Sequence, residues 1–294
     1  MPRTTGRVSA AFLEAGGETR LGDRYHAYPL KIAKAFPFDD GQLGVYVMDA
    51  SPGIMSGDRY ELDWHFGENT KVYVTNQSYT KVHPVLRSAD GSLADQASVQ
   101  RQTLTLARGS VVEYMPEPLM LYKDAYFYSE TEVRMEPGSV LILSETVCPG
   151  RTQRGELFQY GLYRSELKVT FGSELIFCAK QRVEPSSPTQ KLDAIGAWGP
   201  FTHYGALYVF SEQVDAGFAD RVRDYLNRLL GVDEETAVPF SGMKLYSGVS
   251  RTYKYGLVVS VMGCKVYEIQ QLLEAIWKFI RRTYFVDSDI QIRK

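Results

Sequence analysis

Cysteine and histidine are scarce in this chain of 294 residues, which holds three of the first and four of the second. Cys148, Cys178 and Cys264 are widely separated and odd in number, which argues against a disulfide framework and suits a reducing compartment. The histidines form no pair at a spacing of four residues, and no C-x-x-C lies beside them. The sequence therefore encodes no compact transition-metal site.

Long apolar runs and an excess of one charge are also absent. The longest mainly apolar stretch, around Leu257–Cys264, is far too short to cross a bilayer. Residues 1–6 contain no apolar signal core, so we expect a cytoplasmic protein. The formal net charge of −2 gives no electrostatic footprint for nucleic acid or for an anionic membrane. We therefore expect neither of these as a partner.

The signatures of several enzyme classes are missing as well. The chain contains no Walker A loop, no dinucleotide-binding glycine fingerprint, no G-x-S-x-G elbow and no H-E-x-x-H pair. The segment closest to an elbow, Gly53–Gly57, has its serine at the wrong position. We therefore expect no firmly bound cofactor.

Aromatic residues, by contrast, are abundant, with 20 Tyr and 14 Phe. Aromatic side chains favour strands and half-buried surfaces. Tyrosine in particular suits protein interfaces, because one end of the side chain is apolar and the other is hydrated. The composition therefore favours a β protein with a surface suited to binding other proteins.

One pattern of alternating apolar residues, a glycine and an apolar run occurs four times. Large apolar residues lie five and three positions before Gly67, Gly109, Gly138 and Gly172. This period of two predicts strands with one buried face, and each glycine predicts a tight turn with positive φ. We interpret each unit as a β-hairpin and predict a mainly β fold, with hairpins stacked in a layered, solenoid-like body. We expect a single domain over residues 1–294.

Two α-helices are predicted in the C-terminal half. Apolar residues recur at helical spacing from Asp215 to Leu230, where Asp215 is the expected N-cap and Gly231 the stop. A second apolar stripe runs from Ile269 to Ile280, with Glu274 and Lys278 paired on its polar side. We expect both stripes to pack on the sheet. The alternative is that a helix face or a tyrosine-rich surface binds a partner.

Two segments concentrate polar groups that a fold alone does not require. In Ser51–Arg59, Asp58 either caps the turn backbone or takes part in recognition. In Glu145–Glu156, two carboxylates and two arginines form an ion-pair network, a proton-transfer pair or a transient site for a hard cation. The ion pair is favoured because the arginine fork matches a carboxylate well, whereas two carboxylates alone leave a metal incompletely coordinated.

Taken in order, four stretches resemble the urease accessory protein D family (UreD, also called UreH). They are Ser51–Arg59, Thr75–Val82, Glu113–Pro118 and Ser144–Phe158. The similarity spans roughly residues 25–285, and the terminal amphipathic helix with Ile276 and Trp277 fits the end of the family pattern. The positions that match the family motifs are Gly57, Asp58, Thr75, Thr80, Lys81, Pro116, Pro118, Glu145, Gly150, Arg151, Gly155 and Glu156.

The resemblance implies an assembly factor for urease, the nickel enzyme that hydrolyses urea, and no catalysis by the chain itself. Proteins of this family bind apo-urease and recruit UreF and the GTPase UreG, and the complex inserts nickel and a lysine carbamate. A mechanism proposed for the family passes nickel through a channel inside this subunit. The resemblance thereby implies a use for Asp58, Glu145 and Glu156 as transient nickel ligands.

Two other interpretations remain open from the residues alone. The main alternative is a β-solenoid hydrolase that acts on carbohydrate, with Glu145 and Glu156 as an acid/base pair. The other is a binding scaffold unrelated to urease. A hydrolase would show turnover as a purified chain, whereas the assembly interpretation predicts none.

Overall fold

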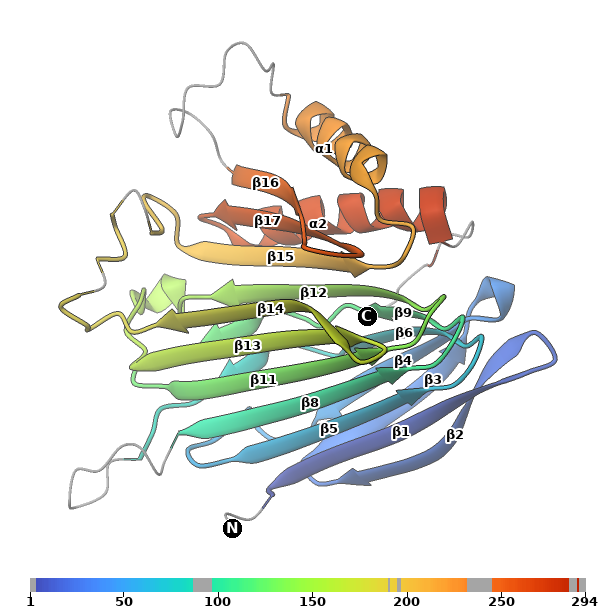
Figure 1. The fold of residues 1–294 in the computed structure, drawn as a ribbon. Coiled ribbons are helices and arrows are strands. Elements are labelled where there is room, and N and C mark those ends of the chain that lie inside the picture. Colours follow the sequence, from blue (N-terminus) through green and yellow to red (C-terminus); the bar gives the residue numbers. More distant parts are fainter. Residues whose placement is uncertain are drawn as a thin grey trace.

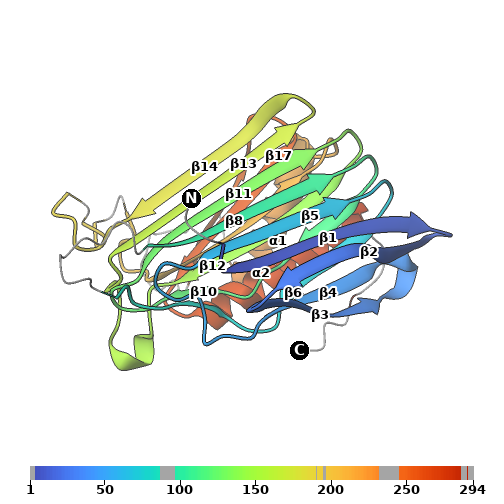
Figure 2. The same cartoon turned by 90° about the horizontal axis from the view of Figure 1, so that it is seen from below.

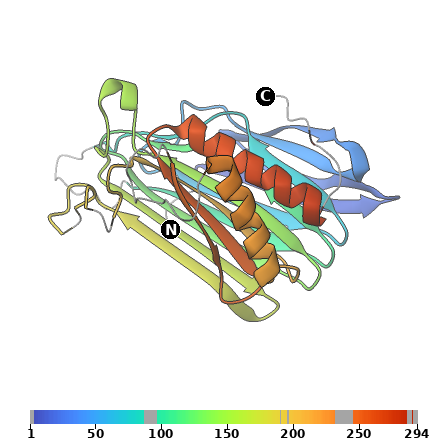
Figure 3. The same cartoon turned by 90° about the horizontal axis from the view of Figure 1, so that it is seen from above.

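Two β-sheets stacked face to face make up most of the protein, and two helices cover the outer face of the larger sheet (Figures 1 and 3). The computed structural model describes residues 4–86, 97–189, 191–194, 197–231, 245–285 and 290. Among these residues, no helix has the length and apolar character needed to cross a membrane.

Each sheet has a simple strand order. The seven-stranded sheet contains β14 (Glu174–Val183), β13 (Leu162–Phe171), β11 (Tyr126–Met135), β8 (Ser98–Leu106), β5 (Arg59–Phe66), β1 (Gly6–Ala15) and β2 (Glu18–Ala27). The ten-stranded sheet contains β16 (Leu245–Arg251), β17 (Gly256–Gly263), β15 (His203–Phe210), β12 (Val140–Cys148), β9 (Val111–Tyr114), β6 (Lys71–Asn76), β4 (Leu43–Asp49) and β3 (Leu30–Pro37). Of its two remaining strands, β10 (Leu119–Leu121) pairs with β12, and β7 (Thr80–Val82) pairs with β10.

From β4 to β13 the chain alternates between the two sheets. In the seven-stranded sheet β5, β8, β11 and β13 run parallel to one another. In the ten-stranded sheet β4, β6, β9 and β12 do the same. Each pair of strands is thus one coil of a two-sheeted solenoid, and the expected mainly β, layered, solenoid-like fold is confirmed.

The hairpin interpretation of the four glycine units is wrong for three of them. The turns at Gly67, Gly109 and Gly138 connect a strand of one sheet to a strand of the other. Only the turn at Gly172 joins antiparallel neighbours, β13 and β14. Apolar alternation indicates which face of a strand is buried but not which strand lies beside it, so the sequence pattern alone could not distinguish the two arrangements.

The space between the sheets is filled by the alternating apolar residues. Trp64, Phe66 and Leu104 point inward from the seven-stranded sheet and meet Leu141 and Leu143 of β12. The intervening residues of β5 and β8 are more exposed on the outer face, as the period of two requires. This core aligns the strand ends on which the polar loops are built.

A second core lies on the other face of the ten-stranded sheet. Ile142 of β12 and Val209 of β15 pack there with residues of both helices. Because β12 has a core on each side, its residues are buried almost without interruption. The apolar stripes of the helices therefore pack on the sheet, as expected.

Both predicted helices are present. Helix α1 (Ala216–Leu230) is capped by Asp215, whose side chain accepts a hydrogen bond from the Phe218 N–H at 2.7 Å, and Gly231 ends it in a left-handed conformation. Helix α2 (Val266–Ile280) carries the expected Glu274–Lys278 ion pair at 2.7 Å. Shorter helical turns occupy Asp39–Gly41, Thr152–Arg154 and Arg281–Phe285.

A buried ion pair ties the end of α2 to the sheet. Arg281 Nε lies 2.9 Å from Glu113 Oε1, and the two side chains are only 2% and 0% exposed. Glu113 also accepts hydrogen bonds from Gln42 Nε2 at 2.7 Å and from Trp277 Nε1 at 3.0 Å. The buried Glu113 carboxylate thus has a hydrogen-bond or ion-pair partner on both oxygens. These interactions fix the position of α2 relative to β9.

Candidate functional site

Segments far apart in the sequence meet at one end of the solenoid. Strand β7 pairs in parallel with β10, β10 pairs in parallel with the end of β12, and Ile54 bridges to Val82. Figure 2 shows β10 beside the end of β12. We call the strip formed by loop 51–58, β7, β10 and loop 149–158 the motif end. It contains residues from three of the four stretches that carry the family resemblance, and the remaining stretch, Glu113–Pro118, leads directly into β10.

Loop 51–58 is closed by Asp58. The Met55 N–H donates to Asp58 Oδ2 at 2.7 Å, and the Asp58 N–H donates to the Met55 carbonyl oxygen at 3.0 Å. Gly57 has a φ of 77°, a conformation that favours glycine. Asp58 therefore caps the turn, as one of its two expected roles requires.

Asn76 joins the second and third motif stretches. Its side-chain Nδ2 donates to Thr80 Oγ1 at 3.2 Å, and its Oδ1 accepts from the Glu117 N–H at 2.5 Å. The Thr80 N–H in turn donates to the Pro118 carbonyl oxygen at 3.0 Å, next to Lys81 on β7. The sequence did not single out Asn76, although an asparagine at the end of a strand is a known turn signal. Two further motif residues, Thr75 and Pro116, lie beside this junction.

Loop 149–158 is held by an internal ion pair. Arg151 Nε donates to Glu156 Oε2 at 2.8 Å, its Nη2 donates to Oε1, and its guanidinium lies 4.3 Å from the centre of the Tyr122 ring. These hydrogen bonds hold the pKa of the Glu156 carboxyl below its usual range. Gly150 permits the loop to close, because a Cβ there would collide with the Glu156 carbonyl oxygen. Gly155 ends the short helical turn in a left-handed conformation.

Glu145 has a different partner from Glu156. It lies in the middle of β12 on the side facing the space between the sheets, with Leu143 and Val147 two residues away on either side. Its Oε1 accepts a hydrogen bond from the Tyr208 hydroxyl at 2.6 Å. Burial raises the pKa of the Glu145 carboxyl, and the bond from Tyr208 opposes part of that rise. The favoured ion pair therefore involves Arg151 and Glu156 but not Glu145.

The three candidate carboxylates do not form a joint ligand set. Asp58 is engaged by its own turn, Glu156 by Arg151 and Glu145 by Tyr208. Across residues 4–86, 97–189 and the other described ranges, no group of three or more His, Cys, Asp or Glu could hold a metal. A cation passing these positions would meet single carboxylates.

The arrangement does not favour the carbohydrate hydrolase. A glycosidase needs two carboxyl groups that face the same sugar ring. Both oxygens of Glu156 accept hydrogen bonds from Arg151, and neither Glu145 nor Glu156 lines the pocket of about 120 Å³ beside loop 51–58. An acid/base pair acting on one bond is therefore not assembled by these residues.

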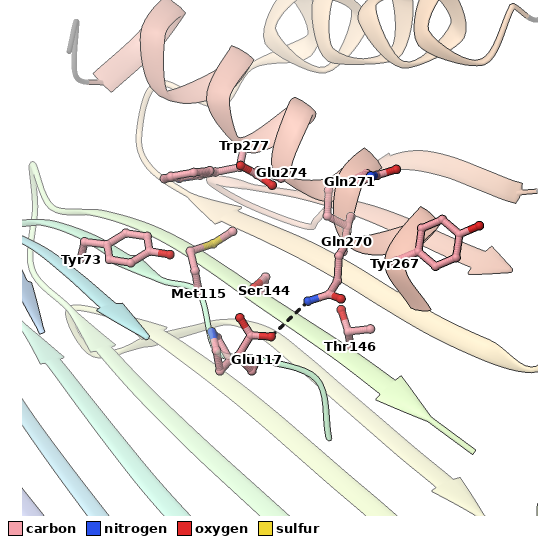
Figure 4. A pocket seen from close by; sticks show the side chains of 12 residues that line it. Tyr73, Met115, Glu117, Ser144, Thr146, Tyr267, Gln270, Gln271, Glu274 and Trp277 are labelled. Carbon is pink, nitrogen blue, oxygen red and sulfur yellow. Dashed lines mark hydrogen bonds between the residues drawn. The ribbon is translucent and has the colours of Figure 1, made fainter. Parts of the chain in front are cut away.

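A groove of about 390 Å³ runs beside the motif end, under α2. We call it the α2 groove. Figure 4 shows its walls, which include Tyr267, Gln270, Glu274 and Trp277 of α2, Met115 and Glu117 after β9, and Ser144 and Thr146 of β12. Helix α2 is connected across it to the residues just before β10 and β7, since Gln270 Nε2 donates to Glu117 Oε2 at 3.3 Å and Tyr79 Oη donates to Gln270 Oε1 at 3.1 Å.

Comparison with known proteins gives whole-chain similarity to one family. The model of the family described as UreD urease accessory protein matches residues 4–293. A urease accessory protein UreD from Acetivibrio thermocellus is 36% identical over 291 residues, which are 97% of this chain and 100% of that protein. The UreD of Lachnoclostridium phytofermentans is 27% identical over 295 residues and 100% of both chains. A urease accessory protein UreD 2 of Brucella abortus is 30% identical over 284 residues, 92% of this chain and 87% of that protein.

Proposed function

The chain belongs to the UreD urease accessory protein family, and from this premise we propose that it is a non-catalytic assembly factor that binds apo-urease in the cytoplasm. It acts together with UreF and the GTPase UreG, and the joint product is urease with nickel in its active site. The observation that carries this proposal is the family match over residues 4–293.

The construction of the motif end supports a binding role. Backbone hydrogen bonds join its segments, for example from the Ile54 N–H to the Lys81 carbonyl oxygen at 2.8 Å. A surface fixed in this way loses little conformational entropy when a partner binds. The sequence has no phosphate-binding loop, so a nucleotide-dependent step belongs to a partner.

Co-purification tests the assembly role. We expect the tagged chain to retain apo-urease and the UreF and UreG homologues of the same organism in one complex, and to show no turnover alone. The measurement is size-exclusion chromatography with mass detection, together with nickel analysis of each peak. A chain that retains none of the three proteins would refute the proposal.

We further propose that nickel passes this subunit as cargo, with Asp58, Glu145 and Glu156 as successive weak ligands. The separation of the three carboxylates supports this proposal, because a single carboxylate supplies too few oxygen ligands to hold a cation tightly and therefore releases it readily. We expect Glu145→Gln and Glu156→Gln to lower the nickel content of urease in cells. Glu174→Gln is the matched control, since it removes a carboxylate at the start of β14 that is paired with Lys254 at 2.6 Å. If both glutamine variants load urease as the wild type does while the complex stays intact, the conduit is wrong.

A further inference from the structure

The charged residues that line the α2 groove are all acidic. They are Glu117 and Glu274, which lie on opposite walls (Figure 4). Glu274 pairs with Lys278, and Glu117 accepts a hydrogen bond from Gln270, but neither interaction places a positive charge in the groove lining. The groove is therefore electrostatically suited to a cation.

Two hydroxyl groups open into the base of the groove. Ser144 and Thr146 are only 7% and 8% exposed, and both line the groove from β12. No hydrogen bond joins either hydroxyl to another described residue, and neither is a buried polar atom without a partner, so both are open to water in the groove. The N–H donors of a ligand could therefore displace water from these hydroxyls and take over its hydrogen bonds.

The remaining surface is apolar and aromatic. Tyr73 and Trp277, which are 2% and 1% exposed, pack against each other with ring centres 5.7 Å apart, and Met115 lies beside them in the lining. The narrow exposed edges of these side chains give the aliphatic stem of a ligand an apolar surface to pack on. A volume of about 390 Å³ lies at the lower end of the range of roughly 300–1,000 Å³ for ligand pockets. It suits one or two side chains better than a large cofactor.

We propose that the α2 groove binds an arginine side chain that a partner protein of the urease assembly presents. Arginine carries five N–H donors in a planar fork, which matches two carboxylates and two hydroxyls better than the compact ammonium of lysine does. The inference rests on the proposed function, because it takes the occupant from a protein that this chain binds.

The first test measures the affinity of the full chain for apo-urease and for the UreF and UreG homologues separately. We expect Glu117→Gln combined with Glu274→Gln to raise Kd for one of them about tenfold, a change typical of losing a charged contact. Thr146→Val, which keeps the shape and removes the hydroxyl, should weaken the same complex by a smaller factor. Glu130→Gln with Glu132→Gln is the matched control, since these half-exposed carboxylates also form ion pairs but lie on the outer face of the seven-stranded sheet.

The second test uses overlapping 15-residue peptides from the affected partner, with binding followed by fluorescence anisotropy. We expect binding peptides to contain arginine, to weaken when that arginine is replaced by citrulline, and to retain little affinity with lysine there. The citrulline peptide should no longer distinguish the wild type from the groove variant. If all partners bind the groove variant and the control equally well, the inference is wrong while the assembly role stands. If no partner binds the wild type, the assembly role itself fails.

Discussion

Replacing Arg281 with methionine is expected to lower the free energy of unfolding by about 3–5 kcal/mol. The reason is that the Glu113 carboxylate, which is 0% exposed, would lose the only positive charge paired with it among the described residues. Methionine has a volume similar to that of arginine, so the loss of stability comes mainly from the unpaired, buried Glu113 carboxylate and less from a cavity. Because domains are typically stable by only about 5–15 kcal/mol, the change removes a large share of the total. Urea denaturation followed by circular dichroism measures it.

Two further variants show whether the unpaired Glu113 carboxylate causes the loss of stability. Glu113→Gln combined with Arg281→Met should recover much of the lost stability, because no buried charge remains. The new amide oxygen can accept from Trp277, and its NH2 can donate to the Gln42 oxygen that Arg281 no longer occupies. Lys254→Met breaks the ion pair between Lys254 and Glu174, whose side chains are 37% and 44% exposed, respectively. Because this pair is at the surface, its loss should change the free energy of unfolding little. An Arg281→Met protein as stable as Lys254→Met would contradict the assigned role of the buried pair.

The same pair has a consequence for the surface beside it. Trp277 of α2 and Arg281, directly after the helix, both reach Glu113, so losing the ion pair loosens the helix that forms one wall of the α2 groove. We therefore expect Arg281→Met to weaken binding indirectly, through loss of structure. The glutamine variants of Glu117 and Glu274 should weaken binding without loss of stability, which separates the two effects.

The helices and the buried faces of the strands could be predicted because local signals specify them. Helix α1 begins after Asp215 and ends at Gly231, with the expected capping interactions, and the apolar stripe from Ile269 to Ile280 is buried on the sheet. The strand partners could not be predicted, since a run such as Val140–Leu143 is compatible with a hairpin or with a solenoid coil. The structure resolves this by pairing β12 with β9 and β15.

The candidate site was only partly visible in the sequence. The Arg151–Glu156 pair and the Asp58 cap could be predicted because both partners lie in one loop. The motif end depends on contacts between segments that are far apart, such as Ile54 with Val82, and nothing local encodes them. Glu113 was also missed, because a single carboxylate in an apolar strand gives no sign of a partner 168 positions away.

The nickel content of urease in cells that lack this gene tests the central claim most directly. Such cells keep the urease, UreF and UreG genes, and urease is purified from them and from cells in which the wild-type gene is restored. If the chain is needed to hold apo-urease during assembly, urease without it should contain little nickel and show only residual activity, and the restored gene should recover both. Fully nickel-loaded, active urease from the deletion cells would contradict the claim.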